Sequence, residues 1–433
     1  MKKMHFILFG LSIASTTFGQ QRLTLQVAIN TALKNSLDIQ LAKDNVEINT
    51  INNNIGIAGG LPTVSATAND NEQVTNINQK YSDASRNAQQ TNVAANILTA
   101  NVTGSIVLFN GYRVLATKSR LEQLQQQSAA LLNVQIQSTI AAVMTKYYDV
   151  VRQQSYVKTI TQSIEVSKQR LSILQTRKDV GLSNNADIFQ AQLDVNALVQ
   201  QLQSQQLVID IAKTDLLNLL YLKSDSTITI SDTIIVNNQL GLENIKAAIK
   251  NNPQILAAEQ QIKINSLIEK ETAAQRYPTV RANTGYNFSN NKVAAGFTLL
   301  NQSYGPFIGL NVAIPIYNGG TIKRQQKIAS INTKSAAIQR DILLVDFENN
   351  VVRSYQAYSN TLQQLKTEAE NYQLSLKLLD LVLQRFQLGQ GTIIDVKQAQ
   401  QSFENEGYRL TNLSYAAKAA EISLQQIANQ LTN

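Results

Sequence analysis

The chain has 433 residues, 43% of them hydrophobic and 16% charged, and its formal net charge is +8. It has no cysteine and one histidine, His5, which excludes thiol nucleophiles and leaves no histidine for a triad or a zinc site once the first residues are removed. The basic residues are scattered, without the clustering that nucleic-acid binding needs. We therefore expect no enzyme, no catalytic, cofactor-binding or metal site, and no nucleic-acid partner.

Residues 1–19 have the pattern of a secretory signal peptide. Lys2 and Lys3 precede a mostly apolar run over 6–18, and cleavage is expected between Gly19 and Gln20. A membrane anchor is the alternative, but the run is short for a bilayer span of about 20 residues. No later segment approaches that length, so a chain of this sequence that spans a membrane must do so as a closed β-barrel.

The rest of the chain consists of two copies of one plan. LPTV at 61–64 returns as YPTV at 277–280, an offset of 216, and LFNG at 108–111 returns as IYNG at 316–319, an offset of 208. The first copy therefore has eight extra residues between these anchors, where the polar stretch 71–96 predicts a loop. We divide the chain into a first repeat (20–221), an equatorial linker (222–240) with a small strand at 227–230, and a second repeat (241–433).

Each copy is expected to contain a pair of strands. Residues 280–288 and 307–317 alternate with a period of two, and 63–70 and 101–109 do so more weakly. Such alternation over about ten residues is typical of a transmembrane strand, and Tyr277, Tyr304 and Tyr317 lie near strand ends, as an aromatic girdle requires. A soluble hairpin packed on helices is the alternative.

A long helix is expected after each strand pair. Residues 112–180 and 321–388 contain neither Gly nor Pro, and at 1.5 Å per residue each helix would be about 100 Å long. A seven-residue repeat of apolar side chains predicts coiled-coil packing and recurs 208 residues later, which a chance amphipathic helix would not explain. Its members are Ile136, Val143, Val150, Val157, Ile164 and Leu171, followed by Leu344, Val351, Tyr358, Leu365, Tyr372 and Leu379.

Each long helix ends at a glycine, Gly181 or Gly389, and a returning helix, 186–221 or 393–431, must run antiparallel to it. Asn184 and Thr392 are expected to cap the returning helices. The acid three residues later, Asp187 or Asp395, suits a capping box. The alternative role of these acids is a ring of carboxylates that narrows a pore mouth.

Four strands cannot close a membrane barrel, because such barrels begin near eight strands. The strand edges must therefore be hidden by oligomerisation, and three chains would supply twelve strands around one opening.

The order and spacing of these motifs resemble those of the TolC-like outer-membrane factor family over nearly the whole mature chain. The motifs are ALKN at 32–35, LP at 61–62, LFNG at 108–111, PIYNGG at 315–320 and the two glycine turns with their following acids. The resemblance implies a mainly α-helical chain with membrane β-structure: a homotrimer whose 12-stranded outer-membrane β-barrel is continued by a long periplasmic α-helical coiled-coil barrel. It also implies outer-membrane lipid, a periplasmic adaptor protein and an inner-membrane pump as partners.

The helical tips are the candidate functional site. The resemblance suggests a tip gate at Asp187, Asp395 and Gln398, although the family's second acid is replaced by Gln398 and its arginine by Gly391. It also suggests adaptor docking at the turns. The docking candidates are Arg177, Gly181, Leu182, Arg385, Gly389 and Gln390.

Simpler roles for these residues stay open. The glycines suit positive φ, and the two arginines suit the negative end of a helix dipole. Tyr147, Tyr148 and Tyr355 are expected to be packing residues, with substrate stacking as the alternative.

The sequence thus predicts an outer-membrane exit duct of a Gram-negative bacterium that extends into the periplasm. It would conduct substrates passively from an inner-membrane pump in a tripartite efflux or type I secretion system. The alternative is a secreted or surface coiled-coil structural or adhesive protein without a pore.

Overall fold

The computed structural model describes residues 21–296 and 298–431, so the predicted signal peptide at 1–19 lies outside the described residues. The chain divides into two compact units. We call the unit formed by 40–135 and 250–347 the sheet unit, and the unit formed by the described residues up to 39, 136–249 and 348–431 the hairpin unit. The long helices α3 (Arg113–Asp179) and α7 (Thr321–Gln387) contribute residues to both.

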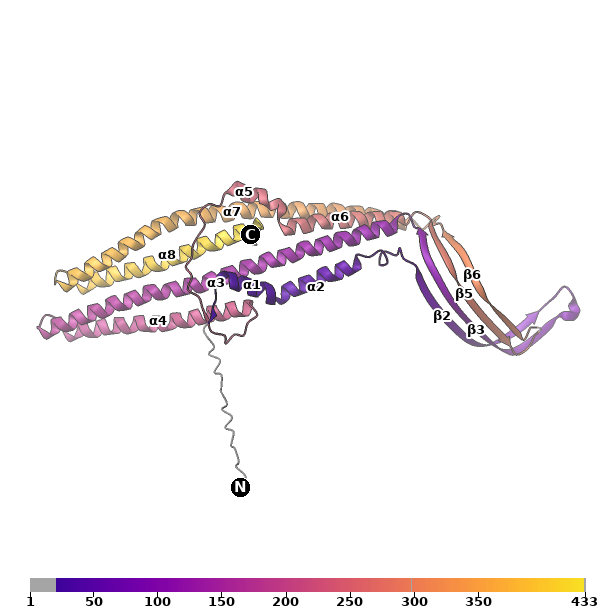
Figure 1. Cartoon of the computed structure of the whole chain (residues 1–433), viewed down its shortest axis with the longest axis horizontal. Coiled ribbons are helices and arrows are strands. Elements are labelled where there is room, and N and C mark those ends of the chain that lie inside the picture. Colours follow the sequence, from indigo (N-terminus) through magenta and orange to yellow (C-terminus); the bar gives the residue numbers. More distant parts are fainter. Residues whose placement is uncertain (1–20, 297, 432–433) are drawn as a thin grey trace, which may run out of the picture. The chain divides into compact units, whose positions relative to one another are not determined.

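The sheet unit contains one antiparallel four-stranded sheet (Figure 1). Its strands are β2 (Thr63–Gln79), β3 (Ala88–Phe109), β5 (Thr279–Val293) and β6 (Leu300–Ala313), in the order β2-β3-β5-β6. The central pairing of β3 with β5 joins the strand pairs of the two repeats. Helices α2 (Leu37–Asn52) and α6 (Pro253–Ala274) precede the two strand pairs, and an ion pair of 2.7 Å between Arg120 and Glu271 holds α3 to α6.

The loop predicted at 71–96 is wrong, because β2 and β3 pair from Thr63 with Ser105 out to Gln79 with Ala88, with one shift of register between Thr75 and Ile77. Only a short turn that includes the 3₁₀ helix η1 (Ala84–Arg86) separates the two strands. Pairing satisfies the backbone polar groups regardless of the side chains, so a segment that is polar on both faces can still be a strand.

The second strand pair also differs from its predicted limits. β5 extends to Val293, whereas β6 ends at Ala313, short of the predicted 317. Pro315 follows, and it has no N–H to donate to a ladder.

The hairpin unit consists of two antiparallel helical pairs, α3 with α4 (Asn185–Leu219) and α7 with α8 (Ile393–Ile427) (Figure 1). Helices α1 (Leu25–Asn35) and α5 (Leu242–Ala248), the 3₁₀ helix η2 (Ile249–Asn251) and a parallel pair of short strands, β1 (Gln21–Arg22) and β4 (Ile228–Thr229), complete the secondary structure of the described residues. β4 lies at the strand predicted in the linker. None of the helices in the described part of the chain has both the length and the apolar character needed to cross a membrane.

The seven-residue repeat forms much of the core of this unit. Val143, Val150 and Val351 are fully buried, as coiled-coil packing predicts. Tyr147 is also buried, and its hydroxyl donates to the Leu23 carbonyl oxygen at 3.0 Å. The packing role predicted for Tyr147 therefore agrees with its position.

Candidate functional site at the helical tips

The first tip is a glycine turn between α3 and α4. Gly181 has a φ of +79°, a conformation that glycine adopts without steric cost. The Leu182 N–H donates to the Arg177 carbonyl oxygen at 2.8 Å, which closes the end of α3 in a Schellman-type bond. At the start of α4 the Asn184 side chain accepts from the Asp187 N–H at 2.9 Å, as the predicted cap requires.

The second tip repeats this geometry and adds a complete capping box. Gly389 also has a φ of +79°. The Thr392 hydroxyl accepts from the Asp395 N–H at 3.2 Å, and the Asp395 carboxylate accepts from the Thr392 N–H at 2.9 Å. The backbone and side-chain hydrogen bonds with Thr392, together with the charge of Arg385, lower the pKa of Asp395. Asp395 is thus ionised at neutral pH and stabilises the first turn of α8.

The two arginines predicted for docking make different contacts. The Arg177 guanidinium, on α3, donates to the Phe386 carbonyl oxygen at the end of α7 and lies 4.5 Å from the centre of the Phe386 ring. The Arg385 guanidinium donates to the Gln390 carbonyl oxygen of its own turn at 3.3 Å. Both side chains therefore stabilise the second turn, and Arg177 also connects the two hairpins.

A pocket of about 400 Å³ lies beside the second turn. Arg385, Asp395 and Gln398 line it, so the structure brings together one predicted docking residue and two predicted gate residues. Asp187 belongs to the other hairpin and does not line this pocket.

A second contact between the hairpins, which the sequence did not predict, is centred on Asp194 of α4. The carboxylate accepts from the Arg170 guanidinium of α3 at 2.6 Å and from the Lys397 ammonium of α8 at 3.2 Å. Burial acts to raise the pKa of Asp194, but hydrogen bonds from Gln190 and Lys397 and the charge of Arg170 outweigh it and leave that pKa below its ordinary value. No local spacing reveals this cluster, because Lys397 is about 200 residues from the other two.

Apolar side chains surround both turns. Val180 and Leu182 at the first tip, and Leu388 and Ile394 at the second, are all largely exposed in this chain. Exposed apolar groups gathered in this way are typical of a surface that contacts another protein.

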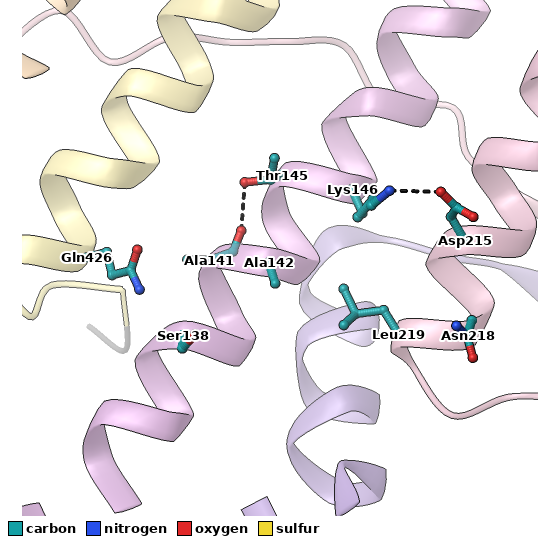
Figure 2. A pocket seen from close by; sticks show the side chains of 9 residues that line it. All are labelled: Ser138, Ala141, Ala142, Thr145, Lys146, Asp215, Asn218, Leu219 and Gln426. Atoms are coloured by element: carbon teal, nitrogen blue, oxygen red, sulfur yellow. Dashed lines mark hydrogen bonds and ion pairs between the residues drawn. The ribbon is translucent and has the colours of Figure 1, made fainter. Parts of the chain in front are cut away.

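Away from the tips, a larger pocket lies among α3, α4 and α8, with Lys146 paired to Asp215 at 2.8 Å and Gln426 on the opposite side (Figure 2). Apart from Lys146, its α3 wall consists of small side chains and includes Thr145, whose hydroxyl donates to the Ala141 carbonyl oxygen at 2.8 Å. The nine lining residues offer one ion pair and otherwise neutral groups. Within the described residues, no group of three His, Cys, Asp or Glu side chains could hold a metal ion.

Comparison with known families decides the class of this protein. A sequence profile described as outer membrane efflux protein matches twice, at residues 28–220 and 244–430. The chain belongs to the outer membrane efflux protein family. Membership confirms the resemblance and the two repeats, and it makes this chain an export protein of the outer membrane that reaches into the periplasm. The boundaries at 221 and 241 remain predictions.

Individual relatives are distant but extensive. The chain is 22% identical over 408 residues to toxin and drug export protein A of Aggregatibacter actinomycetemcomitans, a match that covers 92% of this chain and 84% of that protein. It is also 22% identical over 287 residues to an uncharacterised protein of Haemophilus influenzae, where the match covers 66% of this chain and 62% of that protein. Among solved structures, the outer membrane protein VceC of Vibrio cholerae has the same fold, with a TM-score of 0.76 and 17% identity over 94% of this chain and 96% of VceC.

Proposed function

We propose that this efflux family member is a homotrimeric exit duct that conducts substrates passively from an inner-membrane pump, through the periplasm, to the outside. The pump belongs to a tripartite efflux or type I secretion system. The observation that carries the proposal concerns the two edge strands of the sheet, β2 and β6. In the sequence, each is next to a helix with an exposed apolar stripe: α2 comes before β2, and α7 comes after β6.

The sheet has two edges that pair on one side only within the described chain, β2 and β6. Apolar side chains on these strands are strongly exposed, for example Val64 on β2 and Ile308 on β6. An edge of this kind needs a partner strand, and inside a bilayer it must have one. A second copy of the chain offers the complementary edge, β6 to pair with β2.

The adjoining helices extend the same surface. Directly after β6, α7 carries an exposed apolar stripe at intervals of three, four or seven residues, with each side chain between 49% and 57% exposed. The members of this stripe are Ile328, Ile331, Ile338, Ile342 and Val345. Before β2, α2 has exposed Leu41, Ile48 and Ile51 at intervals of seven and three residues. A copy that pairs its β6 with β2 therefore brings the α7 stripe towards α2, in the spacing of a coiled-coil seam.

This contact is heterologous, with one surface on the β2 side and a different one on the β6 side. Such contacts close into a ring when the rotation between successive copies closes, and a ring of three copies has twelve strands, enough for a membrane barrel. The helices of the ring then form the periplasmic α-barrel.

The helical tips are the end at which an adaptor and a pump would engage. Two features support this: exposed Leu182 and Leu388 at the turns, and the exposed faces of Gly181 and Gly389, where an added Cβ would not clash. Within this proposal Asp395 and Gln398 line the mouth. The contacts of Lys397 with Asp194 and of Arg177 with Phe386 would have to break for the two hairpins to separate.

The test is a charged substitution in the α7 stripe, with a matched control. Ile338→Glu should abolish the trimer in detergent and export in cells, because it places a carboxylate in an apolar seam. Gln339→Glu adds the same charge one residue further on, outside the stripe, and should leave both intact. A normal trimer with Ile338→Glu would contradict the proposed assembly. Wild-type protein that stays folded and soluble without detergent would favour the pore-free coiled-coil alternative.

A further inference from the structure

Two glutamates face each other between α7 and α8, away from the tips. The side chain of Glu368, on α7, is 6% exposed, and that of Glu406, on α8, is 19% exposed. Both carboxyl groups lie next to the guanidinium of Arg409, and each acts on the other. Two ionised carboxylates in such a contact repel each other, so the arrangement requires either a proton or a nearby cation.

The available cation does not satisfy both groups. Arg409 of α8 lies 3.3 Å from one oxygen of Glu406, but its closest approach to Glu368 is 3.7 Å, beyond a hydrogen bond. Oε1 of Glu368 and Oε2 of Glu406 are buried and have no hydrogen-bond donor among the described residues. Each carboxylate therefore has one buried oxygen without a donor, and a proton held between the two groups would supply the missing hydrogen bond.

Two charged side chains of the described chain act on Glu368, those of Glu406 and Arg409. Next to Glu406, Gly407 packs so closely on Thr159 of α3 that an added Cβ would lie 2.8 Å from its hydroxyl. The ring of Tyr408 packs on that of Tyr156 of α3, with 5.2 Å between the ring centres. Two carboxylates and one guanidinium leave one negative charge in a closely packed site, and one proton cancels it.

We propose that Glu368 and Glu406 share one proton, and that this proton makes the packing of α7 against α8 depend on pH. With the proton in place, the carboxyl groups form a hydrogen bond across the helix pair. Without it, two carboxylates repel each other in a buried site and the helices open locally. Because α7 and α8 carry the second tip, the consequence for the duct, which rests on the proposed function, is a tip that loosens as the medium becomes alkaline.

The direction of the effect follows from the titration. Burial, then the hydrogen bond and the charge of Glu406, raise the pKa of Glu368 from 4.5 to about 7, against the opposing charge of Arg409 and a hydrogen bond with Asn371. Because the pKa of Glu368 is higher in the folded protein than in the unfolded chain, protonation at low pH stabilises the folded helix pair. That stabilisation is complete below about pH 4.5, is lost as pH rises to about 7, and changes no further at higher pH.

Infrared spectroscopy of the purified full-length protein tests the shared proton directly. Wild-type protein should show the carbonyl stretch of a neutral carboxylic acid, which should disappear as pH rises through about 7. Glu368→Gln should lack this band, whereas Glu370→Gln, which changes an exposed carboxyl two residues away, should retain it. Identical titrations near neutral pH in wild type and Glu368→Gln would overturn the proposal.

Hydrogen exchange tests the mechanical consequence. After correction for intrinsic rates, amides at 362–374 and 400–412 should exchange at least tenfold faster at about pH 8.5 than at about pH 5.5 in wild type. Glu368→Gln should flatten this difference, because the amide cannot ionise, and Glu370→Gln should preserve it. An unchanged difference in Glu368→Gln would overturn the proposal. The infrared and hydrogen-exchange measurements both report on the α7 and α8 pair, whereas light scattering reports on trimer assembly. A failure of the proposed function can therefore be distinguished from a failure of the shared-proton proposal.

Discussion

The ion cluster of Asp194 offers a stability prediction that can be worked out from the structure. The Arg170 side chain is 1% exposed, and Asp194 is its only ion-pair partner in the described chain. Asp194→Ala leaves this guanidinium buried without a counter-charge, which should destabilise the α3 and α4 pair by about 3–5 kcal/mol. Lys397→Met should cost at most about 1 kcal/mol, because the Lys397 side chain is 57% exposed and solvent screens its charge.

Hydrogen exchange of amides at 163–177 and 188–201 measures this difference, since each factor of ten in exchange is about 1.4 kcal/mol. Asp194→Ala should speed local opening by roughly a hundredfold or more. Asp210→Ala is the matched control, because Asp210 lies on the same helix with a largely exposed side chain and a long 4.0 Å contact to Lys213. A change below about 1 kcal/mol in Asp194→Ala would refute the reasoning. Because the pKa of Asp194 is lowered, wild type should lose this stabilisation as pH falls below the ordinary value of 3.8.

Three further predictions concern the tips and the strand hairpins. Gly181→Glu combined with Gly389→Glu should lower the free energy of unfolding by roughly 1 kcal/mol per site, because both glycines have positive φ. The double variant should form normal outer-membrane trimers that do not export, and normal export would remove the docking claim. Asp395→Asn removes the charge but keeps an acceptor for the cap, so it should raise single-channel conductance; an unchanged conductance would leave Asp395 as a helix cap only. Epitope tags at Ser85 and at Gly296, both in turns, should be labelled on intact cells, and labelling only after permeabilisation would reverse the topology.

Much of the fold could be predicted because it rests on local periodicity. The absence of Gly and Pro and the seven-residue repeat located α3 and α7 to within one or two residues. The burial of Val143 and Val351 confirms the predicted coiled-coil packing. The extended hairpin of β2 and β3 could not be predicted this way, because backbone pairing, not side-chain alternation, defines it.

At the tips, too, the features set by local sequence could be predicted and those set by tertiary structure could not. Asn184 and Thr392 could be recognised as caps because a cap acts three residues away along the chain. The contact of Arg177 with Phe386 joins residues 209 positions apart, and only tertiary structure shows it. It also gives Arg177 a stabilising role next to the docking role proposed for it.

The central claim is that the chain forms a conducting duct, and single-channel recording tests it most directly. Purified full-length protein added to a planar lipid bilayer should produce discrete current steps, and the Ile338→Glu variant should produce none, because it cannot close the ring. Folded wild-type protein that inserts into the bilayer without producing current steps would contradict the account.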